Sequence, residues 1–162
     1  MAVVDYFLNI EGIKGESTDS KHKDEIDLES WSFSESNSGD SAGRGGSGAG
    51  KVSMGDFVFV SKYSKASPML FLSCATGEHV KKATLTCRKA GGKQEEYLKV
   101  VLSDLLVSSY SSGGSAHGEV VPLDQVSINF SKIEWQYSPQ DNTGKVGSPV
   151  KTGYDLKLNK KV

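Results

Sequence analysis

The segment Gly45-Gly46-Ser47-Gly48-Ala49-Gly50-Lys51 has the spacing of a phosphate-binding loop, in which a glycine and a lysine follow the first glycine after four residues. The hydroxyl side chain that should follow the lysine and bind Mg²⁺ is replaced by Val52. A functional loop also precedes a helix whose N-terminus binds the phosphates, whereas the residues after Lys51 predict a strand. We therefore do not expect nucleotide binding here.

The remaining polar residue types do not form a recognisable catalytic or metal-binding pattern. His22, His79 and His117 lie far apart, have no cysteine or carboxylate at ligand spacing, and are expected at the surface. The charged residues between Thr18 and Asp24 are likewise expected to form a solvated face. The serine cluster at 108–112 lacks the Gly-x-Ser-x-Gly elbow of serine hydrolases. These patterns predict no metal site, no cofactor and no enzymatic activity.

Three aromatic residues have rings that could stack on a sugar or a nucleic-acid base. They are Trp31, Trp135 and Tyr137, and all three fall in predicted strands. Aromatic side chains in strands belong to a core or to a protein interface far more often than to a ligand site. We interpret them as packing residues.

Composition indicates a single domain that spans residues 1–162. The 19 Lys and Arg residues nearly balance the 20 Asp and Glu residues, so no overall field attracts nucleic acid or anionic lipid. No apolar run is long enough to predict a membrane span. The segment Met1–Tyr6 lacks a basic region and reaches an acid at Asp5, unlike a signal peptide. We expect synthesis in the cytoplasm, and any export by a route that reads no signal peptide. Cys74 and Cys87 are expected to be free thiols.

The helical signals of the chain are concentrated at Ser67–Gly77. Ser67 is a suitable N-cap, Pro68 suits the first turn, and Gly77 can adopt the left-handed conformation that ends a helix. Met69, Leu70, Leu72 and Cys74 form the expected apolar face, which needs a sheet to cover it.

Alternating apolar residues predict strands over most of the remaining chain. Two segments change phase, which predicts a bulge near Ser30 and another near Ser131. The run 95–110 is too long for a straight strand, and its alternation breaks at Asp104. The sequence predicts a mainly β fold, an antiparallel barrel of about eight or nine strands with one short helix packed on it. Strands whose apolar residues change from one face to the other carry more apolar surface than one barrel buries. This excess favours self-association.

A Gly- and Ser-rich segment, 34–50, separates two of the predicted strands. It has no apolar anchor with which to pack against the barrel. Loops of this length in compact domains are usually functional or disordered. We expect it to be an arm that reaches a partner.

Seven short motifs, in order along the chain, resemble the haemolysin-coregulated protein (Hcp) family of type VI secretion systems. The motifs are 14–17 (KGES), 25–27 (EID) leading to Trp31-Ser32, 48–52 (GAGKV), 88–92 (RKAGG), 96–98 (EYL), 106–109 (LVSS) and 149–154 (PVKTGY). None is specific alone, but their joint order spans essentially the whole chain.

The resemblance implies a structural subunit that forms hexameric rings, which stack into an exported tube resembling a phage tail tube. It implies a contractile sheath, a spike protein and small secreted effectors as partners, with effectors carried or chaperoned in the lumen. It places Trp31 and Ser32 near the lumen or a subunit interface. It assigns ring stacking to the arm residues Ser38, Gly39, Arg44, Gly45, Gly46, Gly48 and Gly50. A monomeric ligand-binding β-barrel is the alternative from a different functional class.

Overall fold

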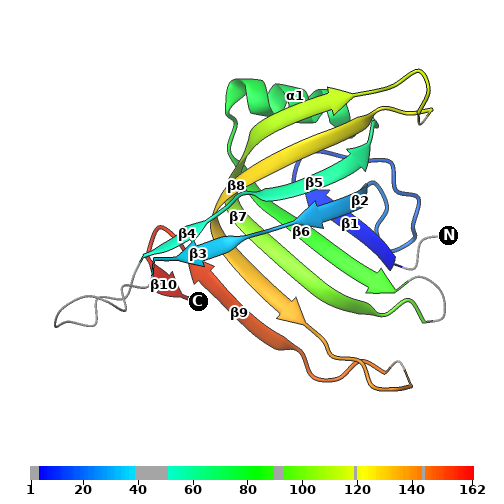
Figure 1. Ribbon diagram of the computed structural model, residues 1–162. Coiled ribbons are helices and arrows are strands. Elements are labelled where there is room, and N and C mark those ends of the chain that lie inside the picture. The colour runs from blue at the N-terminus through cyan, green and yellow to red at the C-terminus, as the bar shows by residue number, and fades with distance from the viewer. Residues whose placement is uncertain (1–3, 39–50, 90–92, 119, 144) are drawn as a thin grey trace.

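The computed structural model describes residues 4–38, 51–89, 93–118, 120–143 and 145–162. These residues form one helix, α1, and ten strands, eight of them in one sheet and two in a separate short hairpin (Figure 1). The elements follow one another along the chain as β1 (Val4–Ile10), β2 (Ile26–Ser32), β3 (Glu35–Asn37), β4 (Val52–Met54), β5 (Phe57–Lys62), α1 (Ala66–Thr76), β6 (Val80–Lys89), β7 (Glu96–Gly113), β8 (Leu123–Tyr137), β9 (Val150–Asp155) and β10 (Lys160–Lys161).

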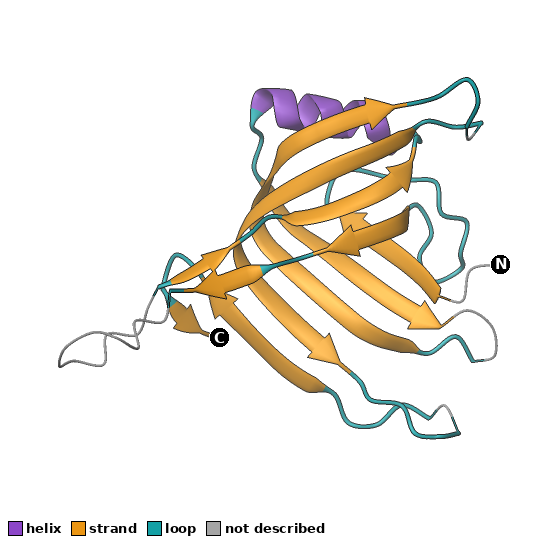
Figure 2. Cartoon of the chain, viewed as in Figure 1, coloured by secondary structure: helices purple, strands orange, loops and turns teal. Residues whose placement is uncertain are grey.

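Six of the strands close into an antiparallel barrel, which confirms the predicted fold class. Their order is β8-β5-β2-β1-β6-β7, and β7 pairs with β8 to complete the circle. Strands β9 and β10 extend the sheet beyond β8, and β3 pairs with β4 as a separate hairpin (Figure 2). Closure pairs the backbone groups that an open sheet would leave at its edges. The interior is filled by large apolar side chains, among them Leu8, Phe57, Phe59, Leu102 and Ile128, which are fully buried.

The long strand β7 bends where the sequence pattern breaks. Asp104 has a φ of 49°, in the left-handed region, and its backbone carbonyl accepts a hydrogen bond from Ser131 Oγ. Strand β8 changes neighbours at this level, because it pairs with β5 up to Ile128 and with β9 from Lys132 onward. The predicted bulge at Ser131 is wrong in detail, since the register shift with β7 lies between Val107 and Ser109.

The phase change in β2 has the cause that the sequence predicts. The pairing of β2 with β5 shifts register between Leu28 and Ser30. The extra residue in a bulge moves the following side chains to the other face of the strand. Trp31 therefore lies on the face that packs against the core.

The helix forms where expected, but it begins one residue earlier and is capped differently. α1 starts at Ala66, and its N-cap Lys65 makes no side-chain cap bond. Ser67, the expected N-cap, is buried; its Oγ donates a hydrogen bond to the Asp124 carboxylate and accepts one from the Ser64 backbone N–H. Gly77 ends the helix with a φ of 64°, as predicted.

The predicted apolar face of α1 is right for Leu70 and Cys74, which pack against the core, and wrong for Met69 and Leu72. The buried residues are Ala66, Ser67, Leu70 and Ser73, whereas Met69 and Leu72 are exposed. Small side chains let the helix lie close to β7, its main contact. No described helix is long and apolar enough to cross a membrane, and Cys74 and Cys87 are free thiols.

Candidate functional site

Trp31 lies at the centre of an aromatic cluster that joins four strands. Its indole ring is 6.0 Å from the ring of Phe57, 6.2 Å from that of Trp135 and 6.4 Å from that of Tyr6, measured between centroids. Ser32, the next residue, is exposed because neighbouring strand residues point to opposite faces. The structure therefore separates the two candidate residues: Trp31 packs, and Ser32 belongs to the outer surface of β2.

The β3–β4 hairpin is the stem of the Gly-rich arm. The Gly55 backbone N–H donates to the Ser34 carbonyl at 2.8 Å and closes the base of the stem. Ser38, at the end of β3, is exposed. The other proposed stacking residues, Gly39, Arg44, Gly45, Gly46, Gly48 and Gly50, lie outside the described residues. Lys51 leads directly into strand β4, which confirms that the phosphate-loop spacing lacks its helix.

A groove of about 620 Å³ runs between this hairpin and the β8–β9 sheet. Phe33, Glu35 and Met54 line the groove on the side of the hairpin. Trp135, Tyr154 and Lys161 line it on the opposite side. The Phe33 and Trp135 rings lie 5.6 Å apart, which makes the floor aromatic. We call this cavity the hairpin groove.

The far ends of β8 and β9 leave further apolar surface exposed beside the groove. Tyr137 is 50% exposed and Val150 is 65% exposed, and the two residues are paired across the strands. An apolar pair on a sheet face that nothing covers in the single chain is typical of a protein interface.

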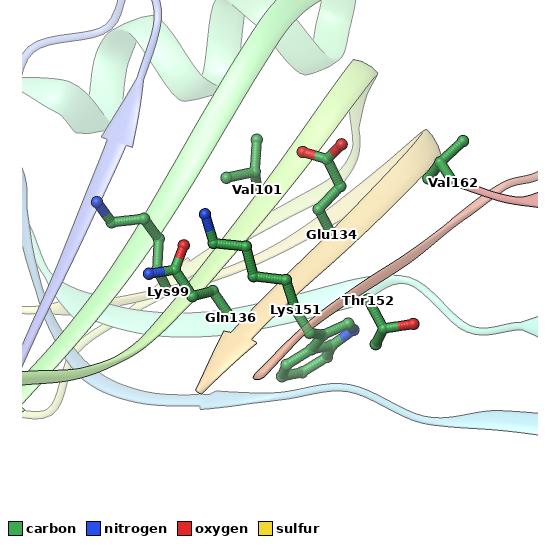
Figure 3. A pocket seen from close by; sticks show the side chains of 8 residues that line it. Lys99, Val101, Glu134, Gln136, Lys151, Thr152 and Val162 are labelled. Atoms are coloured by element: carbon green, nitrogen blue, oxygen red, sulfur yellow. The ribbon is translucent and has the colours of Figure 1, made fainter. Parts of the chain in front are cut away.

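The opposite face of the same sheet is polar. A cleft of about 330 Å³ there is lined by residues that include Lys99, Glu134, Gln136 and Lys151. Figure 3 shows their side chains standing on β7, β8 and β9 around this cleft. Because charges of both signs alternate across it, the cleft offers no strong field for an anion or a cation.

His22, which we expected at the surface, is buried. Its Nδ1 lies 3.0 Å from both carboxylate oxygens of Glu25, and its Nε2 lies 2.7 Å from Oε1 of Glu96. The imidazole stacks on the Phe7 ring at 4.4 Å. A neutral imidazole donates from only one nitrogen, so both contacts are hydrogen bonds to carboxylates only when the ring carries two protons. The cluster ties the loop between β1 and β2 to the barrel.

The charged residues between Thr18 and Asp24, which we expected to form a solvated face, are not all solvated. Asp19 binds the buried side chain of Arg88. Arg88 donates to Asp19 at 3.0 Å from Nη1 and to Asp5 at 3.2 Å from Nε. The Arg88 hydrogen bond lowers the pKa of Asp19 from 3.8 to about 2, and the same bond raises the pKa of Arg88. The guanidinium also lies over the Phe7 ring, 4.7 Å from its centroid.

Both clusters attach the loop between β1 and β2 to the barrel. Within the part of the chain that the structure describes, no group of three or more His, Cys, Asp or Glu residues could hold a metal ion. Only one of these contacts has a signal in the sequence, which is the short spacing between His22 and Glu25. Glu96 comes 74 positions later, and no sequence pattern pairs it with His22.

Comparison with known proteins gives one consistent result. The family model described as "Type VI secretion system effector, Hcp" matches residues 7–137. The chain is 44% identical to protein hcp1 of Pseudomonas aeruginosa over 158 residues, which cover 96% of this chain and 97% of that protein.

Solved structures agree with the sequence match. Hcp1 from Salmonella typhimurium is similar with a TM-score of 0.82 and 37% identity, covering 99% of this chain and all of that one. A protein described only as a type six secretion system protein is similar with a TM-score of 0.91 and 26% identity, covering 98% of this chain and 99% of that one. The closed barrel, the family model over most of the chain and the 44% identity over nearly its full length support the same conclusion. The chain belongs to the Hcp family of type VI secretion proteins.

Proposed function

We propose that this protein is a non-enzymatic structural subunit that forms hexameric rings, and that the rings stack into the exported inner tube of a type VI secretion system. Membership of the Hcp family supports this proposal. The structural observation that carries it is uncovered apolar surface on an otherwise well-packed barrel, at Tyr137 and Val150 and on α1. Copies of the chain would cover this surface in a ring.

The arm and its stem have a role in stacking within this proposal. The β3–β4 hairpin projects from the barrel at the end where β10 lies, and the arm is the segment of the chain that joins its two strands (Figure 1). The arm from Ser38 to Gly50 contacts the adjacent ring. Small effectors are carried in the lumen, with Ser32 on a lumen-facing surface, and the sheath and spike bind the assembled tube. Export follows a route that needs no signal peptide.

Light scattering coupled to gel filtration, with electron microscopy of the same peak, tests the ring. We expect a mass of six times 17.4 kDa and ring-shaped particles. A mass of 17.4 kDa at every concentration would contradict the proposal and favour the monomeric ligand-binding barrel. Replacing residues 39–50 with a short turn tests the arm separately. Rings should persist, and their stacking into tubes should weaken.

A further inference from the structure

Three of the four large apolar side chains of α1 face solvent, whereas the fourth, Leu70, is buried against the barrel together with small or polar residues. Phe71 is 59% exposed, Leu72 47% and Met69 46%, whereas Ser67 and Ser73 are buried. The helix contains no charged residue. An ordinary surface helix turns most of its large apolar side chains toward the core instead. We call Met69, Phe71 and Leu72 the helix face.

The helix face is held in a fixed orientation. The Asp124 carboxylate, which is buried on β8, accepts hydrogen bonds from Ser67 Oγ on the helix and from Tyr110 Oη on β7, the second at 2.9 Å. The Phe71 ring contacts Tyr110 edge-on, with 6.4 Å between centroids. A rigid apolar surface loses little conformational entropy on binding, which favours it as an interface.

The hairpin groove lies away from α1, and none of its lining residues belongs to the helix. Figure 1 shows α1 at the top of the barrel, the β3–β4 hairpin and β10 at the left, and β9 below them. The groove is concave with an aromatic floor, and the helix face is convex and apolar. A closed ring of identical subunits needs two different surfaces that fit each other, because each subunit contacts the next head to tail.

We infer that the helix face of α1 docks into the hairpin groove of a second copy of this chain. The inference rests on the proposed ring and names the two surfaces that form it. Contact between Phe71 and the floor formed by Phe33 and Trp135 would cover apolar area on both subunits.

The charges at the margins of the two surfaces are complementary. Glu78 follows α1 and is exposed, so the helix face has an acid at its C-terminal end, whereas Lys65 at the other end already lies 3.9 Å from the Asp24 carboxylate. The groove has an acid on one wall, Glu35, and a base on the other, Lys161. Docking with Glu78 toward Lys161 places opposite charges together at the rim, where they select the orientation.

Two substitutions at exposed positions test the contact from each side. Phe71→Asp places a charge on the helix face, and Thr152→Trp fills the groove from an exposed position on β9. Each should weaken ring assembly at least about tenfold, measured by sedimentation equilibrium. Val120→Asp is the matched control, because Val120 is fully exposed and belongs to neither surface. Circular dichroism and denaturant unfolding verify that all three variants fold.

A charge exchange tests the orientation. Glu78→Lys should weaken assembly several-fold, and adding Lys161→Glu in the same chain should restore it. If the double variant assembles no better than Glu78→Lys alone, the proposed orientation is wrong.

Cross-linking identifies the partner surface directly. One chain carries Phe71→Cys and another Thr152→Cys, both with Cys74→Ala; Cys87 is fully buried and gives no background. A thiol-specific cross-linker should join the chains only in the mixture. A chain with both cysteines should give a ladder of covalent species up to the closed ring.

Each outcome bears on a specific claim. A monomeric wild-type protein overturns both the ring and the docking contact. A ring that forms equally well with Phe71→Asp and Thr152→Trp overturns the docking contact and leaves the proposed function intact. A cross-link formed by Phe71→Cys alone means that two helix faces meet each other, and this also overturns the docking contact.

Discussion

The Nε2 atom of His22 lies 2.7 Å from Oε1 of Glu96, although the two residues are 74 positions apart in the sequence. This contact connects the loop between β1 and β2 to the start of β7. Asp19 on the same loop accepts a hydrogen bond from the Arg88 side chain. Both clusters share the Phe7 ring, so one aromatic side chain supports an imidazole and a guanidinium.

Replacing His22 with alanine should lower the free energy of unfolding by about 2 kcal/mol, because two contacts with carboxylates and a ring stack are lost in a buried site. Denaturant unfolding at equal protein concentration measures the change. The control is His79→Ala at an exposed position, with an expected change within about 0.5 kcal/mol. Equal effects of the two substitutions would contradict a stabilising role for His22.

Asp19 should stabilise the fold in a pH-dependent way. Its pKa is lowered from 3.8 to about 2 in the folded chain, so the ionised carboxylate stabilises the fold above its unfolded pKa. This contribution is lost as the pH falls from 3.8 to about 2. Asp19→Asn should therefore be less stable than wild type at neutral pH, and the difference should shrink across that window. Unfolding curves at several pH values measure it, with Asp104→Asn at an exposed carboxylate as the control. A constant difference at all pH values would argue against the Arg88 contact as the cause.

The two cysteines should differ in reactivity. Burial raises the pKa of Cys87 to about 12, and its side chain has no exposed surface, whereas Cys74 is half-buried. Because the thiolate is the reactive form, Ellman's reagent should modify Cys74 in the folded protein and Cys87 only after unfolding. Mass spectrometry of the labelled peptides assigns the site. Rapid labelling of Cys87 under native conditions would disprove its burial.

Replacing Gly77 with alanine should destabilise the fold more than the same replacement at Gly113, although both glycines have open surroundings. A Cβ added at Gly77 or at Gly113 would meet no atom within 4 Å, but only Gly77 has a positive φ, of 64°. Gly77→Ala should lower stability by about 1 kcal/mol because the left-handed conformation is unfavourable with a side chain. Gly113→Ala is the steric control and should have little effect. A loss of stability in both variants would point to another cause.

The sequence predicted the type of fold from local patterns. Alternation predicted the strands, the break at Asp104 predicted the bend of β7, and the phase change near Ser30 predicted the bulge in β2. Each of these signals depends on residues that are close in the chain, where backbone geometry fixes which side chains share a face.

The sequence did not predict which face of α1 is covered. Its apolar residues lie almost all around the helix, so periodicity does not distinguish the two faces. The tertiary structure decides it, because a buried Asp124 on β8 binds Ser67 and thereby turns Met69, Phe71 and Leu72 outward.

The sequence by itself determined the mainly β fold, the place of the helix, the Gly-rich segment between β3 and β4, and the family. Only the tertiary structure decided that His22 and Asp19 are parts of the packed structure, that Trp31 and Ser32 face opposite ways, and that a groove forms between the hairpin and β9. The physical reason is sequence separation. Local patterns determine secondary structure, whereas a contact such as that of His22 with Glu96 exists only after barrel closure brings distant strands together.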